Sequence, residues 1–179
     1  MKAVNPIYGL MAEFGSHKTL VDAARRARAE GYRALEAYTP FPVHGLSEAL
    51  GQRRTFVPLF VLIGGMVGGL GGYFMEWYAM AVDYPINIGG RPLHSWPAFI
   101  PITFELTILC ASLSAIVSMI ALNRLPQPYH PVFNVPEFKR ASLDRFFLCI
   151  ESTDPKFDLA ATRAFLSTLA AQSIQEVAA

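Results

Sequence analysis

The stretch that decides the fold is LIGGMVGGLGGYFMEW, which runs from Leu62 to Trp77. Six residues between positions 64 and 72 are glycine, and Glu76 follows them. Glycine destabilises a helix by about 1 kcal/mol relative to alanine. The segment from about residue 56 to 82 is nevertheless predominantly apolar, and Glu76 is its only charged residue. It is longer than the roughly 18 apolar residues that indicate a membrane-spanning helix. We therefore predict a transmembrane helix over this segment.

A second apolar segment runs from about residue 98 to 122, and Glu105 is its only charge. Aromatic residues border the short loop between the two segments, as is typical of a membrane–water interface. They are Trp77, Tyr78, Tyr84 and Trp96. The two segments together predict a transmembrane hairpin within residues 53–124.

The basic residues predict the orientation of this hairpin. The connecting loop carries only Arg91. The flanks carry Arg53 and Arg54 before the first helix, and Arg124, Lys139 and Arg140 after the second. Because basic residues concentrate on the cytoplasmic side, we expect both termini in the cytoplasm.

The glycines of the first segment form one face of the predicted helix, and Glu76 lies on the same face. Small residues four apart let the backbones of two membrane helices approach closely. We therefore predict a helix-packing face made of Gly64, Gly65, Gly68, Gly69 and Gly72.

The second segment has a stripe of small residues that can receive this glycine face. It consists of Thr103, Thr107, Ala111, Ser114, Ser118 and Ala121. Glu105 then lies on the opposite side of its helix, where the chain cannot bury it by itself. An ionised glutamate facing lipid costs at least a few kcal/mol, so a partner helix from another subunit is implied.

Glu76 and Glu105 lie at the same depth, each about 10 Å from the loop end of its helix. Two interpretations stay open for these candidate site residues. They are either buried hydrogen-bonding groups that hold helices together or a pair that handles protons.

The flanks of the hairpin predict an α+β soluble domain. Residues 1–52 read as strand, helix and strand, with Ser16 as the helix N-cap and Gly31 as its end. Residues 143–179 repeat this order, with Asp158 as the cap. Two β-α-β units fit a split ferredoxin-like domain, with the hairpin inserted between its halves. Each half is too small for a stable core, so we expect the halves to pack together or, alternatively, each against another subunit.

The connector, residues 125–142, contains Pro126, Pro128, Pro131 and Pro136. Proline favours an extended backbone without hydrogen-bonded partners. We therefore expect this segment to form a strap along a neighbouring subunit.

Composition excludes several functions. The chain has 179 residues, of which 16% are charged, against roughly 25% in soluble domains, and its net charge is +1. It has no basic run typical of nucleic-acid binding. It also lacks the C-x-x-C-H, P-loop and G-x-S-x-G motifs, and two cysteines cannot form a metal cage alone. We expect no catalytic, cofactor-binding or metal-ligating residue in this chain.

Several long stretches resemble one protein family in order along nearly the whole chain. They are YGLMAEF, AYTPFPVHGL, VDYPINIGGRPLHSWPAFIPITFELTIL, HPVFNVPEF and DRFFLCIESTDPKFD. They are similar to the two-helix D subunit of alternative complex III, a bacterial quinol:electron-acceptor oxidoreductase of respiratory or photosynthetic chains. The resemblance implies an inner-membrane location beside polytopic quinol-binding subunits. It also implies that c-type haems and iron–sulfur clusters belong to partner subunits.

The favoured interpretation is therefore an accessory, non-catalytic membrane subunit that packs beside larger subunits and caps the cytoplasmic side. Direct participation in proton transfer through Glu76 and Glu105 is the alternative. A self-associating small channel is a third interpretation, but neither helix has a polar face along its full length.

Overall fold

The computed structural model describes residues 7–52 and 55–179. Arg53 and Arg54, which entered the orientation argument, lie outside the described residues. The chain divides into two compact units. Of the described residues, one unit combines 7–52 with 128–179, and the other is 55–127.

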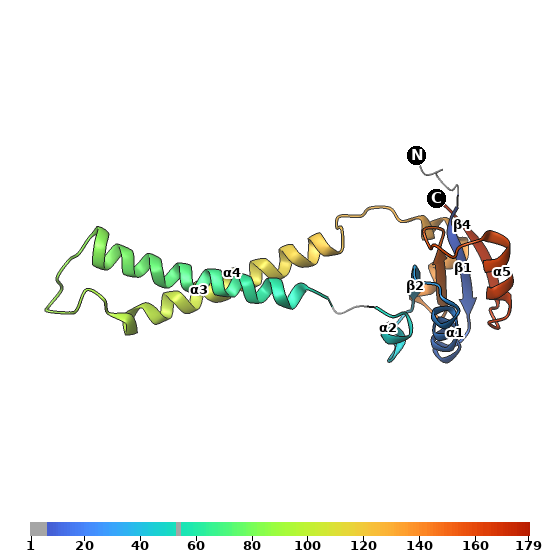
Figure 1. Ribbon diagram of the computed structural model, residues 1–179, viewed down its shortest axis with the longest axis horizontal. Helices are drawn as coiled ribbons and strands as arrows, with labels where there is room; N and C mark the ends of the chain where they lie inside the picture. Colours follow the sequence, from blue (N-terminus) through green and yellow to red (C-terminus); the bar gives the residue numbers. More distant parts are fainter. Residues whose placement is uncertain (1–6, 53–54) are drawn as a thin grey trace. The chain divides into compact units, whose positions relative to one another are not determined.

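The first unit is built on a four-stranded antiparallel sheet (Figure 1). Its strands are β1 (Ile7–Phe14), β2 (Leu35–Tyr38), β3 (Phe146–Glu151) and β4 (Ser173–Ala178). They lie in the order β2-β3-β1-β4, so the two central strands come from opposite ends of the chain. The two soluble flanks therefore form one sheet together, which makes the chain a mixed α/β structure.

Three helices belong to this unit: α1 (His17–Glu30), α2 (Leu46–Ala49) and α5 (Leu159–Ser167). The predicted caps are confirmed. The Ser16 hydroxyl accepts from the Lys18 N–H, and Gly31 ends α1 with a φ of 107°. The Asp158 carboxylate accepts from the Ala161 N–H at 2.8 Å.

One face of the sheet is covered by α1 and α5. Apolar side chains of β1 and β3 pack there against the apolar face of α1 and against Leu166 of α5. The largest fully buried side chains of this core are Leu10, Phe14, Leu20, Leu148, Ile150 and Leu166.

The opposite face of the sheet is covered by the proline-rich connector, which folds into two 3-10 helices, η2 (Pro131–Asn134) and η3 (Pro136–Ser142). The residues that face the sheet are Val132, Val135, Phe138 and Ala141, each at most 8% exposed. The expectation of an extended backbone is therefore wrong for these two helices. The physical reason is that apolar residues repeat every three positions there, which is the period of a 3-10 helix.

A polar cluster joins the start of the connector to the sheet. The Tyr8 and Tyr38 hydroxyls both donate to Oε2 of Glu36, at 3.1 and 2.5 Å. His130, just before η2, lies 3.4 Å from the Tyr8 hydroxyl. Burial, followed by the Glu36 carboxylate, raises the pKa of both tyrosines, so both remain protonated donors.

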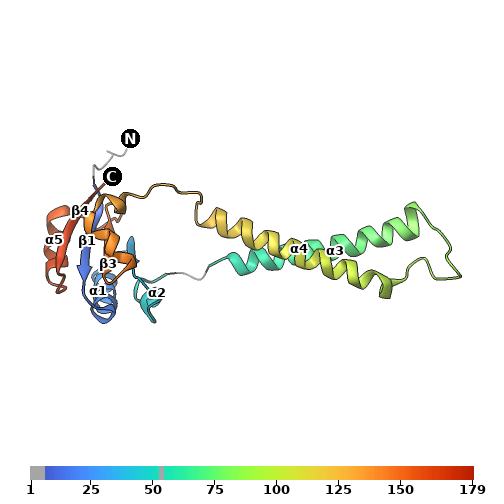
Figure 2. The same cartoon turned by 180° about the vertical axis from the view of Figure 1, so that it is seen from behind.

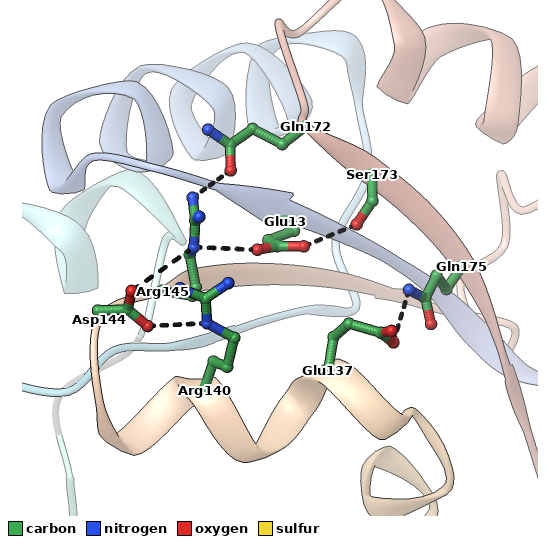
Figure 3. Close-up of polar contacts among 8 residues, drawn as sticks. All are labelled: Glu13, Glu137, Arg140, Asp144, Arg145, Gln172, Ser173 and Gln175. Atoms are coloured by element: carbon green, nitrogen blue, oxygen red, sulfur yellow. Dashed lines mark hydrogen bonds and ion pairs between the residues drawn. The ribbon is translucent and has the colours of Figure 1, made fainter.

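A second cluster joins the end of the connector to the sheet (Figure 3). Glu13 of β1 is 8% exposed, and its carboxylate accepts from the Ser173 hydroxyl at 2.8 Å. Nε of Arg145 lies 3.2 Å from the other Glu13 oxygen, and this guanidinium also donates to Gln172. From η3, Glu137 accepts from the Gln175 amide at 2.8 Å. Glu137 thus holds the connector to β4, and Arg145, three residues after the connector ends, contacts β1.

Replacing Glu13 with glutamine will destabilise this unit by about 1–2 kcal/mol, because Arg145 loses its carboxylate partner while the shape is kept. Pulse proteolysis of native membranes in urea measures the change. Glu176→Gln is the matched control. It removes an ion pair with Arg163 in which both side chains are more than 40% exposed, so the expected change is under about 0.5 kcal/mol. Equal effects of the two substitutions would contradict the assigned role of Glu13.

The second unit is a helical hairpin, formed by α3 (Val57–Tyr78) and α4 (Trp96–Leu122) (Figure 2). A π-helical turn, η1 (Ala79–Asp83), extends α3. With that turn, both helices are 27 residues long and apolar enough to cross a membrane. Pro58 lies at the start of α3 and Pro97 at the start of α4, where a missing N–H costs little.

Candidate helix-packing interface and buried carboxylates

The glycine face of α3 lies directly against α4. A Cβ added to Gly64 would overlap the Ser114 hydroxyl and come within 2.9 Å of the Cys110 carbonyl oxygen. At Gly65, the nearest atom would be the Ala111 Cβ at 3.7 Å, which is ordinary contact. A side chain at Gly64 is therefore excluded by α4, whereas Gly65 makes only ordinary contact with it.

The backbone of α4 comes closest to α3 at Gly68, which is buried. A Cβ there would overlap the backbone carbonyl oxygen of Leu106 and lie 2.7 Å from the Cys110 Cβ. Gly69 would meet the Thr107 hydroxyl at 2.8 Å. Gly71, which points away from this face, has nothing within 4 Å.

Gly72 continues the contact toward the loop end of the hairpin. A Cβ there would lie 2.8 Å from Leu106 Cδ1 and 3.5 Å from the Thr103 Cα. Four of the small residues expected on α4 meet the glycines in this way: Thr103, Thr107, Ala111 and Ser114. Leu106 and Cys110 also contact the glycines. The stripe predicted on α4 consists only of small side chains and does not include these two residues, which contribute backbone as well as side-chain atoms.

Ser118 and Ala121, the other two residues of the stripe, line an apolar groove beside the helix crossing. The groove has a volume of about 560 Å³ and also includes Gly64, Phe60 and Leu113 in its walls. The Ser118 hydroxyl donates to the Ala115 carbonyl at 3.1 Å, so it is satisfied within its own helix. The groove is thus an apolar part of the outer surface of the hairpin.

Glu76 is buried between the two helices, with 7% of its surface exposed. The Thr103 hydroxyl donates to its Oε2 at 3.3 Å. Thr107, one turn further along α4, donates its hydroxyl to the Thr103 carbonyl at 2.7 Å. The Glu76 carboxylate therefore accepts a hydrogen bond from a neutral hydroxyl group of its own chain.

A ring cluster that the sequence did not single out closes the hairpin next to Glu76. The Tyr73 hydroxyl lies 2.6 Å from Nε2 of His94, and both rings pack against Phe99, which is fully buried. Tyr73 lies one turn before Glu76 on the same side of α3. The signal that could have predicted this contact is a tyrosine in the loop-side half of α3 together with a histidine just before α4.

Glu105 has a different environment. It is exposed on α4, on the side away from α3. The structure does not bring the two carboxylates together, because Thr103 and Glu105 lie about 200° apart around α4. Among the described residues, the Glu105 carboxylate makes no hydrogen bond or ion pair. Its neighbours on this side of α4 are exposed apolar side chains.

Comparison with known proteins identifies a family. The model of a family described as "Alternative complex III, ActD subunit" matches residues 8–176 of the chain. The match includes both soluble flanks, the hairpin and the connector. No curated protein matches.

Proposed function

The chain belongs to the ActD subunit family of alternative complex III, and on that basis we propose that it is an accessory, structural membrane subunit of a quinol-oxidising electron-transfer complex. The observation that carries the proposal is the family match over residues 8–176. Its partners are the other subunits of the same complex. Quinol oxidation and the haem and iron–sulfur chemistry belong to those partners.

The hairpin crosses the membrane twice, with both termini in the cytoplasm. Support for two spans comes from the length and apolar composition of α3 and α4. Support for the orientation comes from Arg124, Lys139 and Arg140 after the hairpin, against Arg91 alone in its loop.

The outer surface of the hairpin packs beside large polytopic subunits. This surface is apolar along both helices, and examples are Val67, Leu70 and Val117, each more than 60% exposed. Van der Waals packing drives helix association in lipid, so a surface of this kind fits a neighbouring helix.

The soluble unit is a split ferredoxin-like domain that caps the cytoplasmic side of the complex. Two β-α-β halves, antiparallel pairing throughout and the strand order β2-β3-β1-β4 support this assignment. The connector occupies one face of the sheet and α1 and α5 occupy the other. Partner subunits therefore dock on the sheet edges, the helices or the outer side of the connector.

Affinity purification of the tagged chain from native membranes tests the proposal. We expect mass spectrometry to find polytopic membrane subunits and haem-bearing and iron–sulfur subunits in fixed ratio to the chain. A chain that is recovered alone and monodisperse from those membranes would contradict the subunit assignment.

A direct part in proton transfer is the second candidate function, because Glu76 is buried at a membrane depth where an ionisable group is costly. Its nearest polar partner is Thr103, and Glu105 faces away from it. Proton release per quinol in the Glu76→Gln and Glu105→Gln variants separates the two functions. Wild-type release in both would exclude this second candidate.

A further inference from the structure

Glu105 is too deep in the hairpin to reach water. It lies nine residues from Trp96 and 17 residues from Leu122, which correspond to about 13 and 25 Å along α4. Both distances exceed the reach of a glutamate side chain. In the membrane orientation proposed above, its carboxylate lies in the hydrocarbon region.

The hairpin cannot neutralise this carboxylate. The sequence has no lysine or arginine between Arg54 and Arg91, and none between Arg91 and Arg124. Glu76 is held on the other side of α4 by Thr103. The two helices thus contain two carboxylates and no lysine or arginine.

The residues around Glu105 on its face of α4 offer no hydrogen-bond donor. Ile102, Ile108 and Leu109 are each about half exposed and apolar. The Ser112 hydroxyl, two turns along the same face, donates to the Ile108 carbonyl at 2.8 Å. Apart from Ser112, whose hydroxyl is satisfied within its own helix, this face is apolar and carries one acidic group.

We propose that this face of α4 docks against a transmembrane helix of a neighbouring subunit, and that Glu105 pairs there with an arginine side chain. Charge complementarity selects this partner, because a guanidinium neutralises a carboxylate and binds both of its oxygens. The apolar residues on either side supply the packing, and the single charge pair fixes the register of the two helices. The inference rests on the proposed function, since it needs a second membrane subunit.

The test is retention of the tagged chain by the complex, purified from native membranes, in Glu105→Gln and Glu105→Leu variants. We expect both substitutions to reduce retention by about tenfold or more, because each leaves the partner's cation buried without a counter-charge. Ser112→Ala is the matched control, because it alters the same face of α4 without removing the charge. It should be retained as the wild type is.

The two variants also separate an ion pair from a neutral acid. Glutamine keeps the hydrogen-bonding capacity of a protonated glutamic acid, whereas leucine does not. Full retention of Glu105→Gln with loss of Glu105→Leu would overturn the cationic partner, and retention of both would overturn the docking face. If the wild-type chain itself did not co-purify with other subunits, the proposed function would fail instead.

A suppressor selection identifies the partner residue. A Glu105→Arg chain places two cations together, so we expect reduced assembly of the complex. Recovery is expected from a change of an arginine to an acidic residue in a membrane helix of another subunit. Recovery only through changes within this chain would contradict the proposed pair.

Discussion

Leucine at Gly68 is expected to separate α3 from α4. A Cβ at this position would overlap the Leu106 carbonyl oxygen, a backbone atom that cannot rotate away, and would lie 2.7 Å from the Cys110 Cβ. Overpacking of this kind costs about 3 kcal/mol or more, so the hairpin would open or shift. This is the largest effect that we expect from any single substitution in the hairpin.

A disulfide between introduced cysteines measures the separation in native membranes. A Cβ at Gly65 would lie 3.7 Å from the Ala111 Cβ, which suits a disulfide. With Cys110 and Cys149 replaced by alanine, Gly65→Cys and Ala111→Cys should crosslink efficiently, and adding Gly68→Leu should abolish the crosslink.

Gly71→Leu is the matched control for this experiment. It adds the same side chain to the same helix at a position with nothing within 4 Å. We expect the crosslink to persist in this variant. Equal crosslinking with Gly68→Leu and Gly71→Leu would contradict the glycine interface.

In the soluble unit, the largest loss of stability is expected from Asp154→Ala. Asp154 is 4% exposed, and its carboxylate accepts three backbone N–H groups: those of Arg33 at 2.5 Å, Ala34 at 2.7 Å and Lys156 at 2.8 Å. These contacts join the segment before β2 to the loop after β3. Alanine would leave these donors without their acceptor, which costs about 3 kcal/mol in total. Pulse proteolysis of native membranes in urea measures the free energy of unfolding.

The contribution of Asp154 depends on pH in a defined direction. Burial alone would raise the pKa of this carboxyl group, but the three N–H donors, together with the Arg33 charge, lower it below its ordinary value. A lowered pKa in the folded state means that the stabilisation is complete above the unfolded-state pKa of about 3.9 and is lost below it. The difference in stability between wild type and Asp154→Ala should therefore shrink as the pH falls below about 4. A difference that stays constant down to pH 2 would contradict this role.

The sequence was sufficient to predict elements whose signals are local. Ser16, Gly31 and Asp158 mark helix ends through their own backbone and side-chain chemistry, and all three were correct. Helical periodicity also placed Glu76 on the side of α3 that faces α4. Periodicity could not identify Thr103 as the residue that donates to Glu76, because this contact depends on the axial register of α3 against α4.

The connector shows where composition misled the prediction. Its prolines suggested an extended strap, yet Pro131 and Pro136 lie at the first positions of η2 and η3, where a missing N–H is harmless. The burial of Val132 and Phe138 against the sheet is a tertiary effect, because the face that they cover is completed only when both ends of the chain come together. Their spacing in multiples of three was present in the sequence and is the signal that could have been used.

We propose that this chain supports a quinol-oxidising complex without taking part in its chemistry. The most direct measurement compares quinol oxidation per assembled complex, counted by subunit mass spectrometry, in membranes with and without the chain. We expect that loss of the chain lowers the amount of intact complex severalfold while the rate per remaining complex changes by less than about twofold. An unchanged amount of complex that no longer oxidises quinol would contradict it.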